Sequence, residues 1–272
     1  MKRLLPLAIL AFAAVSQAQV NYSSGFEPST YAPGLLGGQD GWVAGSGGTS
    51  LGAPGVVGSP SPVFAGSQSV QLQGTTTGAT FWSTGHAFAA GAPSTNTNLL
   101  TASAQIWVDT LAAGVDRYFG IGFGTAGTAT SGFIGVGLGG SGLRGNGGSY
   151  ASYNGTATGT LQARTVNDFL GRWVGVSFTA DRSLTTNNVV FQFTNLGTSG
   201  GSATETFTKS VNFGTTNLTT VQLFADWDAT STNAGSAFFD NVSFGANPVP
   251  EPATMAALGI GAVALLRRRK KA

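Results

Sequence analysis

The feature that most limits the fold is a recurring pattern of short apolar runs, rich in Val, Ile, Phe, Trp and Thr, separated by clusters of Gly, Ser, Asn and Asp. Such runs and breaks are typical of β-strands joined by turns. Apolar residues alternate most clearly with small or polar ones at residues 118–123, 174–178 and 190–193. This alternation places one face of each strand in a core. Because no region between the termini has the 3.6-residue periodicity of a helix, the pattern predicts an all-β chain.

The runs predict twelve strands, at residues 20–26, 69–73, 81–88, 99–109, 117–123, 132–137, 149–153, 173–181, 188–194, 205–211, 221–226 and 237–244. Their spacing favours one antiparallel β-sandwich over several small domains. Single all-β domains of about 200–250 residues are common. A sandwich of another topology, or a β-helix, fits the same composition. Glycine and proline account for 52 of the 272 residues, which is below the roughly 25–30% share that is typical of low-complexity chains.

The chain contains no cysteine and a single histidine, His86. The lack of cysteine excludes thiolate catalysis, iron–sulfur clusters and cysteine zinc sites. One histidine cannot form a histidine metal cluster, and no Gly-x-Ser-x-Gly elbow accompanies a plausible Ser–His–Asp set that would suggest a serine hydrolase. We expect His86 to be a surface or half-buried strand residue.

The C-terminal segment, residues 248–272, has three physically distinct parts. It opens with Pro250, Glu251 and Pro252, continues with the uncharged apolar run 253–266, and closes with Arg267, Arg268, Arg269, Lys270 and Lys271. As a helix, the apolar run covers about 21 Å, which is short of a hydrocarbon core of about 30 Å. Snorkelling basic side chains or local bilayer thinning cover the difference. We predict a short transmembrane helix whose basic stop-transfer block stays in the cytoplasm, with the upstream residues across the membrane.

This combination of motif, short apolar span and basic end resembles the bacterial PEP-CTERM sorting signal. The resemblance implies recognition by an exosortase, cleavage near Pro250, Glu251 and Pro252, and release to the cell envelope or extracellular matrix. The inner membrane is then a transient partner, held through the C-terminal helix.

The N-terminal segment, residues 1–18, predicts a secretory signal peptide. Lys2 and Arg3 precede the apolar run 4–15, and Ser16-Gln17-Ala18 supplies the small residues of a cleavage site. The general secretion machinery is therefore an expected partner. Between the two targeting segments remain six basic and ten acidic residues, a net charge of −4. The high overall isoelectric point belongs to the chain ends, so it does not indicate nucleic-acid binding.

Residues 19–247 resemble, over most of their length, a concanavalin A-like (laminin G-like) jelly roll. The resemblance rests on Gly25-Phe26-Glu27, on Gly38-Gln39-Asp40-Gly41-Trp42, on Trp173 at the head of a strand, and on the closing run 239–244. It implies a single antiparallel β-sandwich of the kind found in exported sugar-binding proteins.

Glycosidases of this fold carry carboxylates at alternate positions in a Glu-x-Asp-x-x-Glu run. No such run occurs between the two targeting segments of this chain. The two glutamates there, Glu27 and Glu205, lie in unrelated parts of the sequence. The close pair in Asp226-Trp227-Asp228 has two interpretations: a sugar or cation site with Trp227 as a platform, or a solvated strand end.

Glycine-rich stretches at 120–124 and 135–142 lack the helix and lysine of a phosphate-binding loop. They favour strand curvature and tight turns instead. Gly145-Asn146-Gly147-Gly148 predicts a turn, and the polar run 195–204 predicts a solvated linker.

A structural Ca²⁺ is the one cofactor worth testing. The first and last strands of a jelly roll often pair, which would bring Glu27 and Asp240 together. The resemblance to exported sugar-binding sandwiches implies a cation at such a junction, completed by backbone carbonyls. The other interpretation of Asp240 is a strand-end turn.

Taken together, these features predict a non-enzymatic β-sandwich exported to the envelope or matrix, structural or adhesive, with an extracellular polysaccharide as its expected partner. A lectin-like module that binds through Asp226, Trp227 and Asp228 is the alternative, and a glycan-degrading enzyme is a third.

Overall fold

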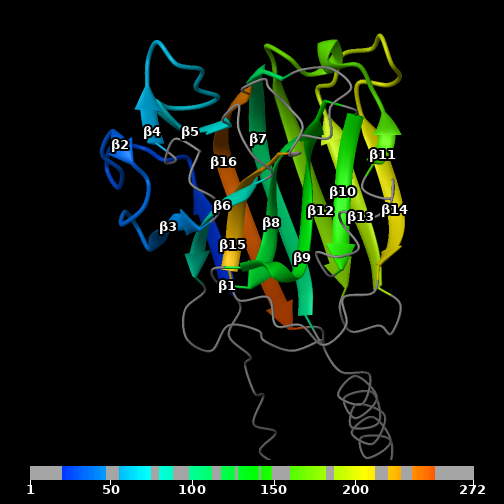
Figure 1. Cartoon of the computed structure of the whole chain (residues 1–272), viewed down its shortest axis with the longest axis horizontal. Coiled ribbons are helices and arrows are strands. Elements are labelled where there is room, and N and C mark those ends of the chain that lie inside the picture. The colour runs from blue at the N-terminus through cyan, green and yellow to red at the C-terminus, as the bar shows by residue number, and fades with distance from the viewer. Residues whose placement is uncertain are drawn as a thin grey trace, which may run out of the picture.

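The apolar alternation along the chain produces two antiparallel β-sheets that pack face to face (Figure 1). The computed structural model describes residues 20–46, 55–74, 80–87, 98–111, 118–125, 128–140, 142–148, 160–181, 187–211, 220–227 and 235–248. In this part of the chain no helix is long and apolar enough to cross a membrane. The predicted signal peptide, the transmembrane segment and the basic block lie outside these residues.

The nine-stranded sheet has the order β14-β13-β12-β7-β16-β5-β4-β2, and β1 pairs with β16. Its strands are β1 (Val20–Ser24), β2 (Gly34–Leu35), β4 (Gly55–Gly58), β5 (Gln68–Gly74), β7 (Asn98–Thr110), β12 (Trp173–Asp181), β13 (Asn187–Thr194), β14 (Glu205–Val211) and β16 (Gly235–Pro248).

The seven-stranded sheet has the order β11-β10-β9-β8-β15-β6-β3. Its strands are β3 (Trp42–Ser46), β6 (Thr80–Ala87), β8 (Tyr118–Thr125), β9 (Thr128–Gly139), β10 (Gly142–Gly148), β11 (Thr160–Ala163) and β15 (Thr220–Trp227). A 3-10 turn, η2 (Val166–Asp168), follows β11. The chain repeatedly changes sheet, and strands that are distant in sequence become neighbours, which is the jelly-roll arrangement. The predicted all-β antiparallel jelly-roll sandwich is confirmed.

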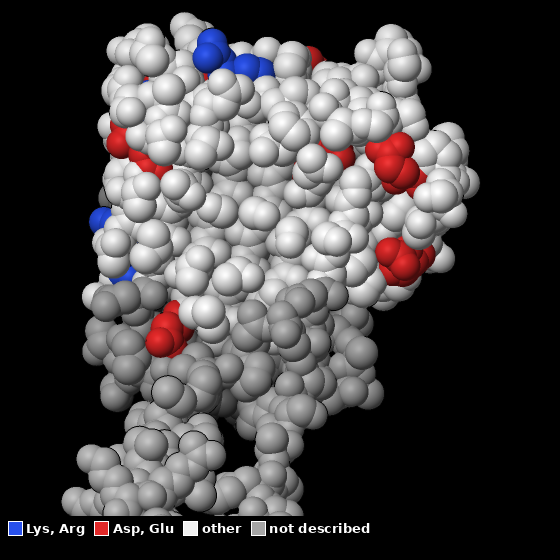
Figure 2. Space-filling view, turned by 180° about the vertical axis from the view of Figure 1, so that it is seen from behind, with Lys and Arg blue, Asp and Glu red and all other residues white. Residues whose placement is uncertain are grey.

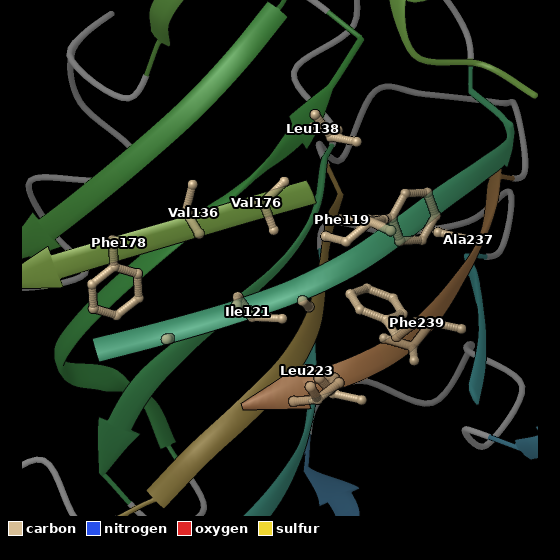
Figure 3. Packing of buried hydrophobic residues seen from close by; sticks show 14 of the residues in the cluster. Phe119, Ile121, Val136, Leu138, Val176, Phe178, Leu223, Ala237 and Phe239 are labelled. Atoms are coloured by element: carbon tan, nitrogen blue, oxygen red, sulfur yellow. The ribbon is translucent and has the colours of Figure 1, made fainter. Parts of the chain in front are cut away.

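The core lies between the sheets, where the apolar face of each strand meets the other sheet (Figure 3). In β12 the burial alternates residue by residue, with Val174, Val176 and Phe178 inside. Phe123 of the seven-stranded sheet packs edge-on against Phe178 and Phe244 of the other, with ring centroids 5.9 and 5.6 Å apart. Burying each such side chain contributes roughly 1.5–3 kcal/mol.

Most of the predicted strands are confirmed, and β12 and β14 begin and end where the sequence placed them. The predicted strand at 149–153 lies outside the described residues. Five strands were missed: β2, β3, β4, β10 and β11. The prediction of a turn at Gly145-Asn146-Gly147-Gly148 is wrong, because these residues continue β10 in register with β9. Glycine lacks strand propensity, so only pairing with a neighbouring strand reveals this element.

Glycines also allow β8 and β9 to approach their neighbours closely. Gly120 and Gly137 face each other across the two strands. A Cβ atom at Gly120 would collide with the Val136 carbonyl oxygen and the Phe224 ring, and one at Gly137 would collide with the Phe119 carbonyl oxygen. Since the obstacles include backbone atoms, side-chain rearrangement cannot relieve the clash.

We therefore expect Gly120→Ala to lower the free energy of unfolding by about 1–3 kcal/mol, the usual cost of overpacking. Gly85→Ala is the matched control, because a Cβ there would meet its nearest atom, the Val221 carbonyl oxygen, at 3.5 Å, an ordinary contact. Urea denaturation of both variants measures the difference. Equal stability of the two variants would show that the close approach at Gly120 is absent.

Candidate functional site

A group of hydrogen-bonded polar side chains forms around Asp240, in the middle of β16. This carboxylate is fully buried. Its Oδ2 accepts hydrogen bonds from the backbone N–H groups of Phe64 (2.9 Å) and Ala65 (3.1 Å), and its Oδ1 accepts one from Asn241 N–H (2.7 Å). The β16 register shifts after Asp240, and Asn241 adopts a left-handed conformation with φ of 45°. This bulge aims Asp240 at the loop before β5 and ties that loop to the sheet; we call it the Asp240 clamp.

Glu27 holds the same loop from the other side. Its carboxylate accepts from the Ser67 N–H (3.1 and 3.2 Å) and the Ser67 hydroxyl (3.0 Å). A Cβ atom at Gly66 would collide with the Glu27 carboxylate, and Gly66 has a φ of +73°. A glycine is therefore required at that point of the loop for two independent reasons.

The two carboxylates approach each other, as the pairing of first and last strands implied. β1 and β16 are paired from Val20 to Ser24. A Cβ at Gly25 would lie 3.7 Å from Asp240 Oδ1 and 3.9 Å from Glu27 Cγ, so both side chains border the same point. The pKa of Asp240 is raised chiefly by its burial and also by the nearby Glu27 charge, although the three N–H donors oppose the shift.

Glu27 and Asp240 have the oxygen chemistry that Ca²⁺ prefers, and a cation there would relieve their mutual repulsion. Calcium takes about six to eight oxygens, more than two carboxylates supply. Within the described ranges no group of three or more His, Cys, Asp or Glu residues could hold a metal. Backbone carbonyls or water would have to complete the shell, so calcium stays a prediction.

The second predicted site begins at the end of β15. Asp226 pairs with Phe81 of β6 and Tyr118 of β8, and Trp227 pairs with Thr80. Both residues thus belong to β15, where Asp226 is paired on both sides and Trp227 is paired with β6. Asp228 lies outside the described residues, as do Pro250, Glu251 and Pro252.

A buried ionic cluster that the sequence did not predict holds the polar loop between β13 and β14. Arg164 Nη1 donates to the Gly197 carbonyl oxygen (2.9 Å), and Nη2 donates to the Ser202 carbonyl oxygen (2.9 Å) and Glu205 Oε1 (2.5 Å). Asp168 lies 3.6 Å from Arg164 Nη1, and both side chains are fully buried. The run 195–204 is the predicted linker between β13 and β14, and most of it is exposed, but Leu196 and Gly197 are buried and the carbonyl oxygens of Gly197 and Ser202 bind the buried guanidinium. The i,i+4 spacing of Arg164 and Asp168 was the available signal.

The surroundings of the Asp168 carboxylate in this cluster favour its ionised form. Burial alone would raise the pKa of Asp168. The Ser199 hydroxyl, the Arg164 charge and the Gly200 N–H lower it by more than burial raises it, so the pKa lies below its ordinary value. Asp168 therefore stays ionised and compensates the buried arginine.

A third polar group joins the N-terminal region to the core. The Tyr22 and Tyr31 hydroxyls lie 2.6 Å apart, Tyr31 donates to Asp40 Oδ2 (2.7 Å), and Trp42 Nε1 donates to Tyr22 (2.8 Å). His86 is half-buried against the Tyr22 ring, with centroids 4.3 Å apart, which confirms its expected position. Burial raises the pKa of both tyrosines, so their hydroxyls remain protonated donors.

Comparison with protein families finds one match: residues 248–270 match the PEP-CTERM protein-sorting motif. This confirms the predicted sorting signal, which is that of an exported protein processed by an exosortase and anchored in the membrane beforehand. The match covers the tail and leaves the sandwich unassigned. A comparison with curated protein sequences finds no match.

Solved structures with a similar fold include peanut lectin, with 14% identity and a TM-score of 0.46 over 85% of this chain and 99% of that chain. Arcelin-5, a lectin-like defence protein from Phaseolus vulgaris, has 9% identity and a TM-score of 0.49 over 85% and 99%. The endo-β-1,4-glucuronan lyase from the fungus Trichoderma reesei has 14% identity and a TM-score of 0.48 over 78% and 93%. The fold assignment of this chain rests on its own strand order.

The calcium hypothesis predicts that added Ca²⁺ raises the melting temperature of the purified protein and that EDTA reverses the rise. At 100 times the dissociation constant, binding stabilises by about 2.7 kcal/mol. Glu27→Gln is expected to abolish the response, whereas Glu205→Gln keeps it. A melting temperature that neither Ca²⁺ nor EDTA changes would remove calcium from the site.

Asp168→Asn removes the charge that compensates Arg164, and we expect a loss of about 3–5 kcal/mol in the free energy of unfolding near pH 7. Because the folded pKa of Asp168 is depressed, its contribution is present above pH about 4 and disappears as the pH falls through the folded value. The deficit of the variant should therefore shrink in acid. Exposed Asp109→Asn is the control, expected within about 0.5 kcal/mol at every pH. A deficit that stays the same from neutral pH to pH 3 would contradict the ionised state of Asp168.

Proposed function

We propose that this chain is an exosortase substrate whose β-sandwich acts outside the cytoplasm as a structural or adhesive component of the cell envelope or extracellular matrix. The observation that carries the proposal is the position of the sorting motif. β16 ends at Pro248, and the motif match begins at the same residue. The sorting signal thus follows directly from the last strand of the sandwich, and cleavage near Pro250, Glu251 and Pro252 would release the folded domain whole.

The proposal of a non-catalytic domain is supported by the structural roles of five of the described carboxylates. Asp240 and Glu27 accept hydrogen bonds from the loop before β5, Asp168 and Glu205 surround Arg164, and Asp40 accepts from Tyr31. Each of them stabilises a loop or a strand junction. A glycosidase instead needs two carboxyl groups that flank a bond in the substrate.

The alternative is a lectin-like module that binds through Asp226, Trp227 and Asp228. Its support is that the first two residues end β15, a strand between two neighbours in the seven-stranded sheet. Turnover of a polysaccharide by the purified protein would instead favour the third hypothesis, a glycan-degrading enzyme.

The sorting proposal is tested in a host that contains an exosortase. We expect the unaltered protein in the envelope or medium in a shortened form. Pro250→Ala combined with Pro252→Ala should instead accumulate uncut in the inner membrane, because the motif for cleavage is lost while the apolar run and basic block remain. Membrane fractionation and immunoblotting with tags on both sides of the motif measure this.

The matched control combines Pro28→Ala with Pro33→Ala, two exposed prolines in the sandwich. This control should be processed like the unaltered protein. Identical fractionation and size of all three forms would contradict exosortase processing.

A further inference from the structure

The outer face of the nine-stranded sheet presents two rows of uncharged side chains, all polar except Val190. One row crosses four strands through Thr101, Thr179, Val190 and Thr208. The next row, parallel to it, runs through Ser103, Ser177, Gln192 and Thr206. Neighbouring strands lie about 4.8 Å apart, so each row extends over about 14 Å. Apart from Val190, which is exposed, the side chains of the two rows carry hydroxyl or amide groups.

No residue of these two rows carries a charge. Seen from the side opposite to Figure 1, the surface is white over most of its centre, and charged side chains lie toward its margins (Figure 2). The alternation of the strands explains this pattern, since their other face is apolar and buried. A polyanion or a nucleic acid would find no counter-charge in these rows.

Aromatic side chains lie beyond the second row, on the far side of a row formed by Gln105, Gly175 and Thr194. Trp107 and Trp173 are directly paired across β7 and β12, with ring centroids 5.9 Å apart. Phe64 packs edge-on against Trp173, with ring centroids 5.7 Å apart. Its side chain is 45% exposed, and few other large apolar side chains among the described residues are exposed. We call these three residues the aromatic end. Aromatic rings of this kind offer apolar faces on which the C–H faces of sugar rings can pack.

The Asp240 clamp fixes the geometry of the aromatic end. Phe64 lies in a loop, but Asp240 accepts from its backbone N–H and from that of Ala65, and Glu27 secures Ser67. The ring is thereby held beside Trp173 before any ligand arrives. Holding a contact residue in place beforehand lowers the entropy cost of binding.

We propose that this face, the two polar rows together with the aromatic end, binds a neutral polysaccharide. The inference deepens the proposed function, on which it rests, by giving the polysaccharide class and the surface. Hydroxyl and amide groups pair with sugar hydroxyls, the aromatic end packs against a sugar ring, and the absence of charge matches an uncharged chain. A second copy of this chain is a poorer occupant, because the core of a protein interface is more apolar than these rows.

The test measures retention of the full purified chain by three probes: microcrystalline cellulose, β-1,3-glucan and, as an acidic polymer, alginate. We expect retention by at least one neutral probe and not by alginate. Phe64→Ala and Thr179→Arg should each weaken that retention by about tenfold, since one removes the aromatic contact and the other places a bulky charge in the central row. Their matched controls are Val43→Ala, at an exposed residue of β3 in the other sheet, and Thr165→Arg, at an exposed residue of the loop after β11. Both should bind like the unaltered protein.

Three results would overturn the inference. Retention only by alginate, or by no probe, removes neutral glycan as the ligand. Retention that survives both face variants but is lost in Trp227→Ala moves the site to the end of β15. A change of oligomeric state in Thr179→Arg, measured by light scattering, makes the face a contact between copies. Each result leaves processing at the sorting motif unaffected, so failure here is distinguishable from failure of the proposed export.

Discussion

The pairing of β16 with three other strands is the constraint on which the rest of the structure depends. β16 pairs with β1, β5 and β7, and it thereby joins the two ends of the described chain in the middle of one sheet. Its bulge aims Asp240 at the loop that carries Phe64, and its last residue begins the sorting motif. Fold, loop geometry and the exit of the chain toward the membrane therefore all require the same strand to be in place.

The fold was predictable from the sequence wherever a strand has a distinct inner and outer face. β12 and β14 alternate clearly and were located residue by residue, and the junction of Glu27 with Asp240 followed from the pairing of first and last strands. Gly-rich β10 was not predictable, because its residues have no strand preference of their own. The partners of Asp240 and Arg164 could not be predicted for another reason. They are mostly backbone groups, which every residue possesses, so only the folded structure shows which of them form the hydrogen bonds.

Charge is distributed in a way that suits a protein outside the cell. Buried or half-buried carboxylates and Arg164 stabilise loops from within, while the two polar rows on the outer face of the larger sheet carry no charge and are rich in hydroxyl groups. Seven of the thirteen basic residues of the chain lie in its two terminal segments, where the sequence predicts a signal peptide and a stop-transfer block. The sandwich between them is weakly acidic, and its two uncharged polar rows are compatible with a polysaccharide matrix.

The most direct test of this account is the intact mass, with terminal peptide mapping, of the protein recovered from outside the cells of its native host. The account predicts a chain that begins at Gln19 and ends near Pro250, Glu251 and Pro252, without the apolar run or the basic block. Recovery of the protein only from the cytosol, with both termini intact, would contradict it.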